Sequence, residues 1–124
     1  ELEDSGPAEY SILAVEKWIH DGQKDGKSVK GEKIRAYLEE TDMIKDCLGL
    51  RVLKEIQEKG IVFFKKHFQG QAVFGWKGLV RDRGGSLCAP YLCEAGGEVV
   101  LLWRWLGGVW CGRSPALRLA SAKV

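Results

Sequence analysis

The stretch that decides the fold is residues 53–76, which read LKEIQEKGIVFFKKHFQGQAVFGW. Up to Lys59 its apolar residues recur every three or four positions, which is the period of an amphipathic helix. Gly60 then stands where a left-handed residue commonly ends a helix. Beyond it, residues 61–68 are β-branched and aromatic, and residues 71–76 resume that composition after a Gly-containing turn. The stretch therefore predicts a helix that leads into a β-hairpin.

Helical patterns also precede this stretch. The apolar positions of residues 8–20 fall on one helical face, so we expect a first helix there. A glycine-containing turn follows, with a short strand at residues 27–29 and a second helix over about residues 30–40. The helical period continues over residues 43–59, where Gly49 is a candidate break between two pieces.

This order of elements resembles the winged helix-turn-helix superfamily over about residues 8–80. The run LKEIQEKGIV, from Leu53 to Val62, carries the resemblance because it leads the third helix into the hairpin. The pattern is one of hydrophobic spacing, and it assigns the chain to no particular family within the superfamily. The expected fold class is therefore α+β and winged-helix-like, with three helices packed on a β-hairpin.

Composition changes along the chain, and it divides the sequence into three parts. Residues 1–7 are an acidic lead-in, and residues 8–80 are the expected domain. Residues 81–124 hold seven of the 16 glycines, three of the four cysteines and three of the five tryptophans. We expect this part to be an irregular, Gly/Trp/Cys-rich C-terminal tail that is partly disordered or loosely packed. Because the first residue is Glu1, the chain is expected to be a fragment or a processed product.

One segment of the tail is strongly apolar. Residues 99–106 read VVLLWRWL, and pairs of glycines bound them on both sides. This composition is typical of a buried strand. If nothing covers the segment, it is either an aggregation hazard or a strand that binds a partner.

The charge pattern directs attention to the expected hairpin. A net charge of +2 is too small for the whole chain to count as a polyanion binder, so the argument depends on local clusters. No acidic residue occurs from Ile61 to Val80. In DNA-binding members of the superfamily, the third helix enters the major groove and the wing contacts the backbone. The resemblance therefore implies contacts to phosphate by Lys65, Lys66, His67 and Lys77, and contacts nearer the groove by Arg51 and Lys54.

Two functions from different classes remain open. The first is a nucleic-acid-binding module, with DNA preferred to RNA and the nucleus preferred to the cytoplasm. The second is a protein-interaction or adaptor module within a larger assembly, with the mixed-charge third helix and exposed aromatic residues as its contact surface. Lysines on a short edge hairpin also have a purely structural explanation, because they discourage pairing between strands of different molecules.

Several other functions are not expected. The two histidines, His20 and His67, are far apart, and no catalytic or nucleotide-binding motif occurs, so we expect neither an enzyme nor a small-molecule substrate. Cys88, Cys93 and Cys111 are one thiolate short of a closed zinc site unless Cys47 or a histidine completes it, so we expect no metal or cofactor. No apolar run reaches the roughly 18 residues of a membrane span, and the N-terminus is acidic, so we expect an intracellular chain.

Overall fold

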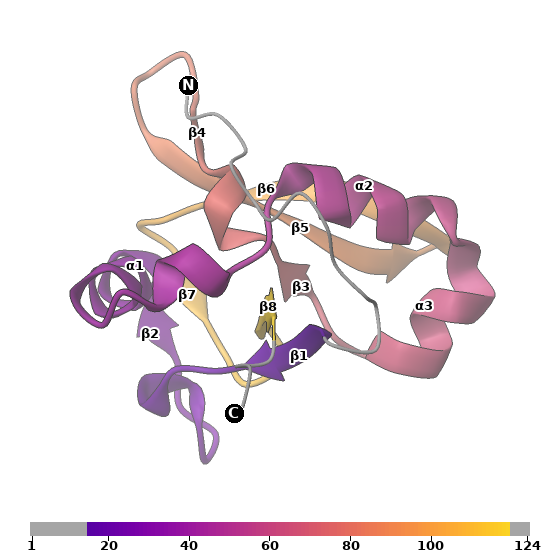
Figure 1. Cartoon of the computed structure of the whole chain (residues 1–124), viewed down its shortest axis with the longest axis horizontal. Coiled ribbons are helices and arrows are strands. Elements are labelled where there is room, and N and C mark those ends of the chain that lie inside the picture. The colour runs from indigo at the N-terminus through magenta and orange to yellow at the C-terminus, as the bar shows by residue number, and fades with distance from the viewer. Residues whose placement is uncertain (1–14, 120–124) are drawn as a thin grey trace.

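The structure is a computed structural model that describes residues 15–119 (Figure 1). Its helices are α1 (Gly31–Glu40), α2 (Leu50–Glu58) and α3 (Gly60–Phe68), joined by the short 3-10 turns η2 (Asp21–Gln23), η3 (Met43–Asp46) and η4 (Trp76–Gly78). Its strands are β1 (Val15–Trp18), β2 (Val29–Lys30), β3 (Val73–Phe74), β4 (Val80–Arg81), β5 (Leu87–Ala95), β6 (Glu98–Trp105), β7 (Val109–Trp110) and β8 (Ala116–Leu119). Within this range, no helix combines the length and the apolar character that crossing a membrane requires.

Six of these strands form one mixed sheet. Its order is β1-β8-β3-β5-β4, and β6 pairs with β5 outside this path. The ladder between β5 and β6 is the longest, running from Cys88 opposite Trp105 to Ala95 opposite Glu98. Strand β8 pairs antiparallel with β1 and parallel with β3, while β2 and β7 form a separate small ladder.

A tight turn fixes the register of the β5–β6 hairpin. Its two central residues, Gly96 and Gly97, have φ angles of +62° and +81°. Positive φ at both positions is the requirement of a type I′ turn, whose twist matches that of the flanking strands. Two glycines meet this requirement without the steric cost of a Cβ atom. The turn therefore places Ala95 opposite Glu98. This first pair determines which residues lie opposite each other along the rest of the ladder.

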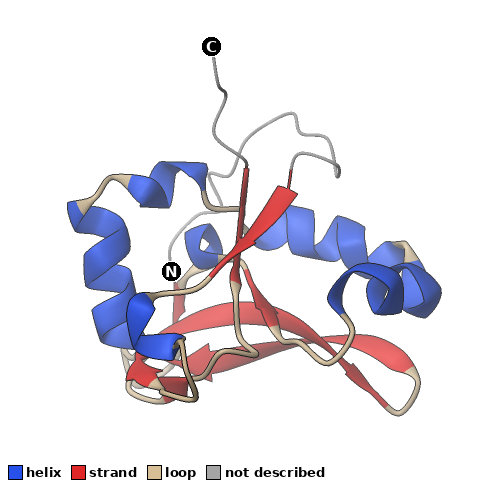
Figure 2. Ribbon diagram, turned by 90° about the horizontal axis from the view of Figure 1, so that it is seen from below, coloured by secondary structure: helices blue, strands red, loops and turns tan. Residues whose placement is uncertain are grey.

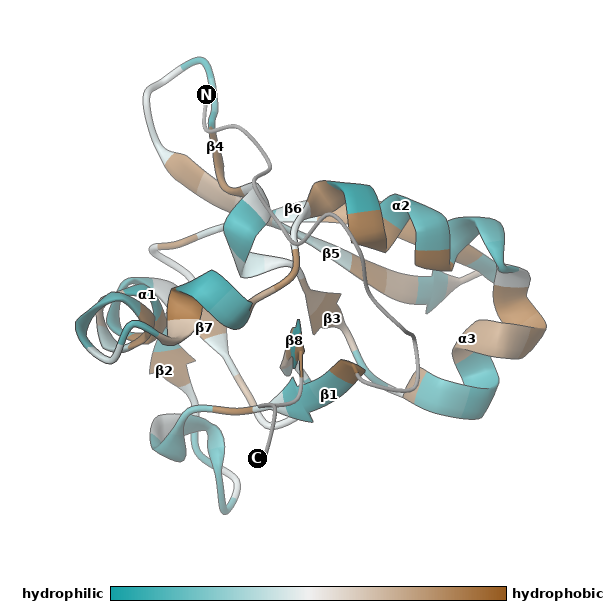
Figure 3. Cartoon of the chain, viewed as in Figure 1, coloured by the Kyte–Doolittle hydropathy of each residue, from teal (hydrophilic) through white to brown (hydrophobic). Residues whose placement is uncertain are grey.

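Helices α2 and α3 form an antiparallel pair along one face of the β5–β6 hairpin, and Figure 2 shows the helices on one side of these long strands. Hydrophobic and hydrophilic residues alternate along the ribbon of α2 in Figure 3, as expected of an amphipathic helix. The core between helices and sheet is built from Leu48, Val52, Leu53, Ile56, Phe64, Phe68, Val73, Leu92, Val99 and Leu117. A second core gathers Ile34 and Leu38 of α1 with Phe74, Trp76 and Trp110.

The expected winged-helix fold is wrong, and residues 61–68 show why. They form helix α3 and not the first strand of a hairpin. Phe64 and Phe68 lie four positions apart with ring centroids separated by 5.4 Å, and both are buried, whereas Val62 is 80% exposed. In a strand, Val62 and Phe64 would share one face. Tertiary burial of a helical stripe has therefore overridden the strand propensity of this run.

The irregular tail of the expected fold class is also corrected. Residues 81–119 supply β5, β6, β7 and β8, so much of the sheet comes from this part of the chain. Strand β3 pairs with both β5 and β8, so the sheet joins residues on the two sides of position 80. Leu92 of β5 and Val99 and Leu101 of β6 pack in the core beneath the helices, which explains why a stretch rich in Gly and Trp still forms regular strands.

Of the other predicted helices and strands, some are confirmed and one is wrong. The second helix is confirmed as α1, and Gly49 does separate the third helical stretch into η3 and α2. The expected helix over residues 8–20 is wrong where it is described, because Val15–Trp18 is strand β1; residues 8–14 lie outside the described range. The segment of residues 99–106 is confirmed as a strand in all but its last residue.

Candidate functional site

The basic residues expected on a wing lie instead on the last turn of α3. Lys65, Lys66 and His67 occupy that turn, which is hydrophilic in Figure 3. Cations there are stabilised by the negative end of the helix dipole. The Lys65 Nζ atom lies 3.5 Å from the carboxylate of Glu94, and the ring of His67 packs against Phe63 with centroids 4.4 Å apart. Lys65 and His67 therefore make contacts within the fold.

The other three predicted site residues lie elsewhere. Arg51 and Lys54 are exposed on α2, and Lys77 lies in η4, where its Nζ atom donates a hydrogen bond of 3.0 Å to the carbonyl of Lys45. The six residues thus belong to α2, α3 and η4. No common hairpin carries them, so the wing on which they were expected is not found among the described residues, while their contact with nucleic acid stays a prediction.

The exposed apolar surface points to β6. Among the described residues, the large hydrophobic side chains that are exposed are Tyr37, Val62, Leu102, Trp103, Trp105 and Val109. Three of them are on β6, where Leu102 is 43%, Trp103 is 41% and Trp105 is 57% exposed. Among residues 15–119, the one strand that pairs with β6 is β5, so β6 forms an edge of the described sheet. Edge strands usually carry Lys, Pro or a bulge that prevents pairing, and the sequence of β6, EVVLLWRW, has neither Lys nor Pro.

The hairpin register determines which main-chain groups of β6 face outward. The residues that flank a two-residue hairpin turn form a hydrogen-bonded pair, and such pairs then alternate along an antiparallel ladder. Glu98, Val100, Leu102 and Arg104 therefore direct their N–H and C=O groups toward β5. The alternate residues, Val99, Leu101, Trp103 and Trp105, direct theirs toward the open edge.

Contacts at the two ends reduce this open edge to a short window. The Nε2 atom of Gln57 on α2 donates a hydrogen bond of 3.0 Å to the carbonyl of Val99. The N–H of Gly108 donates one of 2.9 Å to the carbonyl of Trp105. Within residues 15–119, no hydrogen bond reaches the outward groups of Leu101 or Trp103. We call this pair of residues the β6 window: it offers two N–H donors and two C=O acceptors.

The side chains around the β6 window form two different surfaces. Leu101 and Trp103 point to the face that α2 and α3 partly cover, and Leu102 points to the opposite face. On that opposite face, the guanidinium of Arg104 lies 5.5 Å from the ring centroid of Tyr91 and 5.6 Å from that of Trp110. Arg104 also donates a hydrogen bond to the carbonyl of Val109, so its charge is held in place beside Leu102.

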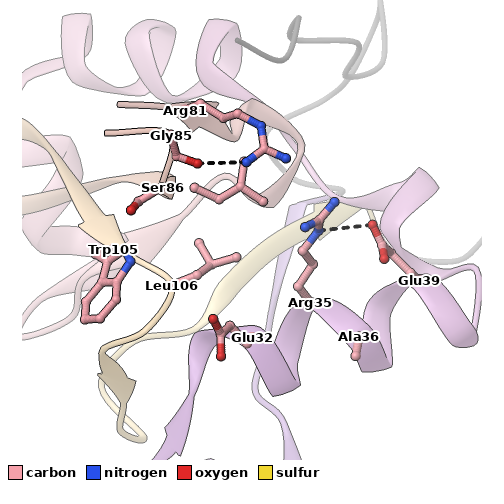
Figure 4. Close-up of a pocket in the computed structure, with 10 residues that line it drawn as sticks. Glu32, Arg35, Ala36, Glu39, Arg81, Gly85, Ser86, Trp105 and Leu106 are labelled. Carbon is pink, nitrogen blue, oxygen red and sulfur yellow. Dashed lines mark hydrogen bonds and ion pairs between the residues drawn. The ribbon is translucent and has the colours of Figure 1, made fainter. Parts of the chain in front are cut away.

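A cavity of about 500 Å³ adjoins the end of β6 (Figure 4). It lies between α1 and the β4–β5 turn, and Trp105 and Leu106 line it from the β6 side. Its charged lining residues are two arginines and two glutamates, and three of the four make contacts: Arg35 pairs with Glu39 at 3.1 Å, and Arg81 donates a hydrogen bond of 2.8 Å to the carbonyl of Gly85. The cavity therefore lies next to the exposed Trp105. Both arginines that line it are already engaged by other groups of the chain.

Three of the four thiols are less acidic than a free cysteine side chain. Burial raises the pKa of Cys47 to about 12, and burial also raises the pKa of Cys88 and of Cys93. Cys88 and Cys93 are five positions apart on β5, so they point to opposite faces of the sheet. Among the described residues, no group of three or more His, Cys, Asp or Glu side chains could hold a metal ion.

Sequence reasoning recognised residues 99–106 as a strand that is either an aggregation hazard or a partner-binding strand if nothing covers it, but it could not place that strand at the edge of the sheet. The signal that was available is the absence of Lys and Pro from an apolar run that holds two tryptophans. Comparison with known proteins adds no further constraint. No protein-family model, no curated protein and no solved structure matches the chain.

Proposed function

We propose that the protein is a non-enzymatic protein-interaction module that docks an extended segment of another chain along β6. The observation that carries this proposal is the β6 window, in which the main-chain groups of Leu101 and Trp103 are open beside the exposed side chains of Leu102, Trp103 and Trp105. An added strand satisfies the main-chain groups of an exposed sheet edge, and its alternate side chains contact the two faces.

The aromatic residues supply the affinity that a short ladder lacks. Each hydrogen bond contributes only about 0.5–1.5 kcal/mol net, because water satisfies the same groups when the edge is free. Tryptophan is enriched among the residues that dominate interface energies, since its large ring buries much area with little loss of side-chain freedom. Trp103 and Trp105 are therefore the expected anchors, and the cavity beside Trp105 can receive a side chain of the docked segment.

A peptide-display selection tests this proposal. A library of segments about ten residues long is selected against the wild-type chain, against Leu102→Lys and against Val62→Lys, at a concentration at which the chain is monomeric. Val62 is a matched control because it is 80% exposed but lies on α3. We expect wild type and Val62→Lys to enrich segments with alternating apolar residues, and Leu102→Lys to retain them at least tenfold less well. Equal retention by all three chains, or no enrichment, would refute the proposal.

Nucleic-acid binding is a second candidate, favoured by one observation at α3. The Nζ atom of Lys59 lies 5.5 Å from the ring centroid of Phe63, which also packs against His67, and Lys66 is exposed beside them. An aromatic ring among cations is the arrangement on which unpaired bases stack. If Lys65 and Lys66 bind phosphate, replacing both with Ala lowers the slope of log affinity against log salt by about two. A nuclear location belongs to this candidate and stays a prediction.

A further inference from the structure

We propose that the segment that docks on β6 is β6 of a second copy of this chain, paired antiparallel about a twofold axis that passes beside Leu102. The inference rests on the proposed function, because it names the occupant of the same edge. It starts from the β6 window, whose two open residues are placed symmetrically on either side of Leu102.

This symmetry makes the window complementary to itself. In an antiparallel pair centred on Leu102, Leu101 lies opposite Trp103 of the second copy, and Trp103 lies opposite Leu101 of the second copy. Outward-facing residues form the hydrogen-bonded pairs of such a ladder, and each pair exchanges two N–H···O bonds. Four hydrogen bonds result, and they use both donors and both acceptors of the window in each copy.

Neighbouring registers satisfy fewer of these groups. Centring the axis on Leu101 would place Trp103 opposite Val99, whose carbonyl already accepts a hydrogen bond from Gln57. Centring the axis on Trp103 would place Leu101 opposite Trp105, whose carbonyl already accepts one from Gly108. In either case one N–H of the window in each copy lacks its acceptor. Leu102 is the centre at which the whole window is paired while both intramolecular contacts remain.

The side chains agree with the same register. Leu102 faces Leu102 of the second copy in a non-hydrogen-bonded pair, where Cα atoms lie about 4.5 Å apart, so an exposed apolar side chain becomes covered by its equivalent. Trp103 lies beside Leu101 of the second copy on the other face. Arg104 lies opposite Val100, and Glu98 lies beyond the paired segment, so no like charges of β6 are opposed. The strand contains no Lys or Pro that would resist this pairing.

The decisive experiment is a charge-complementation series followed by sedimentation velocity over a range of concentrations. Wild type and the control Val62→Lys are expected to form dimers whose fraction rises with concentration. Leu102→Lys and Leu102→Glu are each expected to weaken dimerisation at least tenfold, because the axis places two like charges opposite each other. An equimolar mixture of the two variants is expected to recover a heterodimer, because position 102 then opposes lysine to glutamate.

Each contrary result has a definite meaning. A wild-type chain that stays monomeric at every concentration overturns the dimer, and the peptide selection then decides the proposed function separately. A dimer that neither Leu102 variant weakens, or a mixture that does not associate more than its components, overturns the register. Circular dichroism establishes that both variants are folded before they are compared.

Disulfide cross-linking between two copies tests the same axis without introducing a charge at position 102. The test uses a chain that carries Cys111→Ser, because Cys111 is exposed and would itself be oxidised. In this background, Leu102→Cys puts two cysteines opposite each other at the twofold axis, and their Cα atoms lie within the separation that a disulfide spans. We expect mild oxidation to cross-link this variant at least tenfold more than Val100→Cys, whose thiol lies opposite Arg104 of the second copy. Equal cross-linking of the two variants would overturn the axis at Leu102.

Discussion

Gln57 and Val99 are joined by a hydrogen bond of 3.0 Å from the side-chain Nε2 atom to the main-chain carbonyl. This contact ties α2 to the open edge of β6, and it satisfies an acceptor that would otherwise face outward. It therefore sets one end of the β6 window, as the hydrogen bond from Gly108 to Trp105 sets the other. The short length of the docking edge follows from these two contacts.

Replacing Gln57 with Ala tests the first of these contacts. The variant loses a half-buried hydrogen bond, so we expect the free energy of unfolding to fall by about 1 kcal/mol. Urea denaturation measures this change. Glu58→Ala is the matched control, because Glu58 is exposed on the same helix and surface substitutions usually change stability by less than about 0.5 kcal/mol. Equal effects of the two substitutions would contradict the role of Gln57.

Three substitutions in α3 test whether residues 60–68 are helical. Phe64 is fully buried and Phe68 nearly so, and truncation of a buried Phe to Ala costs about 3–5 kcal/mol. Val62→Ala is expected to change the free energy of unfolding by less than about 0.5 kcal/mol, because Val62 is 80% exposed. In a strand, Val62 and Phe64 would both point inward. A loss of 1 kcal/mol or more from Val62→Ala would therefore argue for the strand and against α3.

Gly31 marks a close approach between α1 and the β6–β7 connection. A Cβ atom built at Gly31 would meet the ring of Trp110 and lie 2.9 Å from the carbonyl of Leu106. We expect Gly31→Ala to lower the free energy of unfolding by at least about 1–3 kcal/mol, since overpacking forces the backbone or the ring to move. Gly84→Ala serves as the control, because the nearest atom to its Cβ would be at 3.5 Å. Thermal unfolding that ranks both variants alike would contradict this packing.

Cys47 gives the protein a pH dependence of known sign. Burial raises the pKa of its thiol from 9.0 to about 12, so above pH 9 the folded chain keeps a proton that the unfolded chain releases. Stability from this source is complete below pH 9 and is lost as the pH rises toward 12. Relative to Cys47→Ala, wild type is expected to lose about 1 kcal/mol between pH 8 and pH 10. Denaturation under reducing conditions measures both chains, and parallel pH profiles would contradict the burial of the thiol.

The parts of the fold that were predictable depend on local patterns. The amphipathic spacing of α1, the break at Gly49 and the strand character of residues 99–106 are all visible in short stretches of sequence. Residues 61–68 misled the prediction, because β-branched and aromatic residues favour strands in isolation. A second signal was present: Phe64 and Phe68 are four residues apart, which is a helical spacing, and the structure buries both rings.

The candidate site was predictable only in part, for a related reason. The sequence shows that residues 99–106 are apolar enough to be buried against another part of the protein or a partner. The position of β6 at the edge of the sheet, however, depends on how β3, β4 and β8 pair. The pairings of β3 and β8 join residues far apart in the chain, such as Phe74 with Ala116, and no local pattern encodes them. The basic residues near position 65 were assigned to a hairpin that does not exist, so their chemistry was inferred from the wrong element.

The most direct test of the docking edge is residue-resolved amide hydrogen exchange at Leu101 and Trp103, with Val100 as the internal reference because its N–H already faces β5. As the protein is concentrated, or when a selected segment is added, exchange at Leu101 and Trp103 is expected to slow at least tenfold while the rate at Val100 changes little. Rates at Leu101 and Trp103 that stay constant under both conditions would contradict the claim that β6 receives another strand.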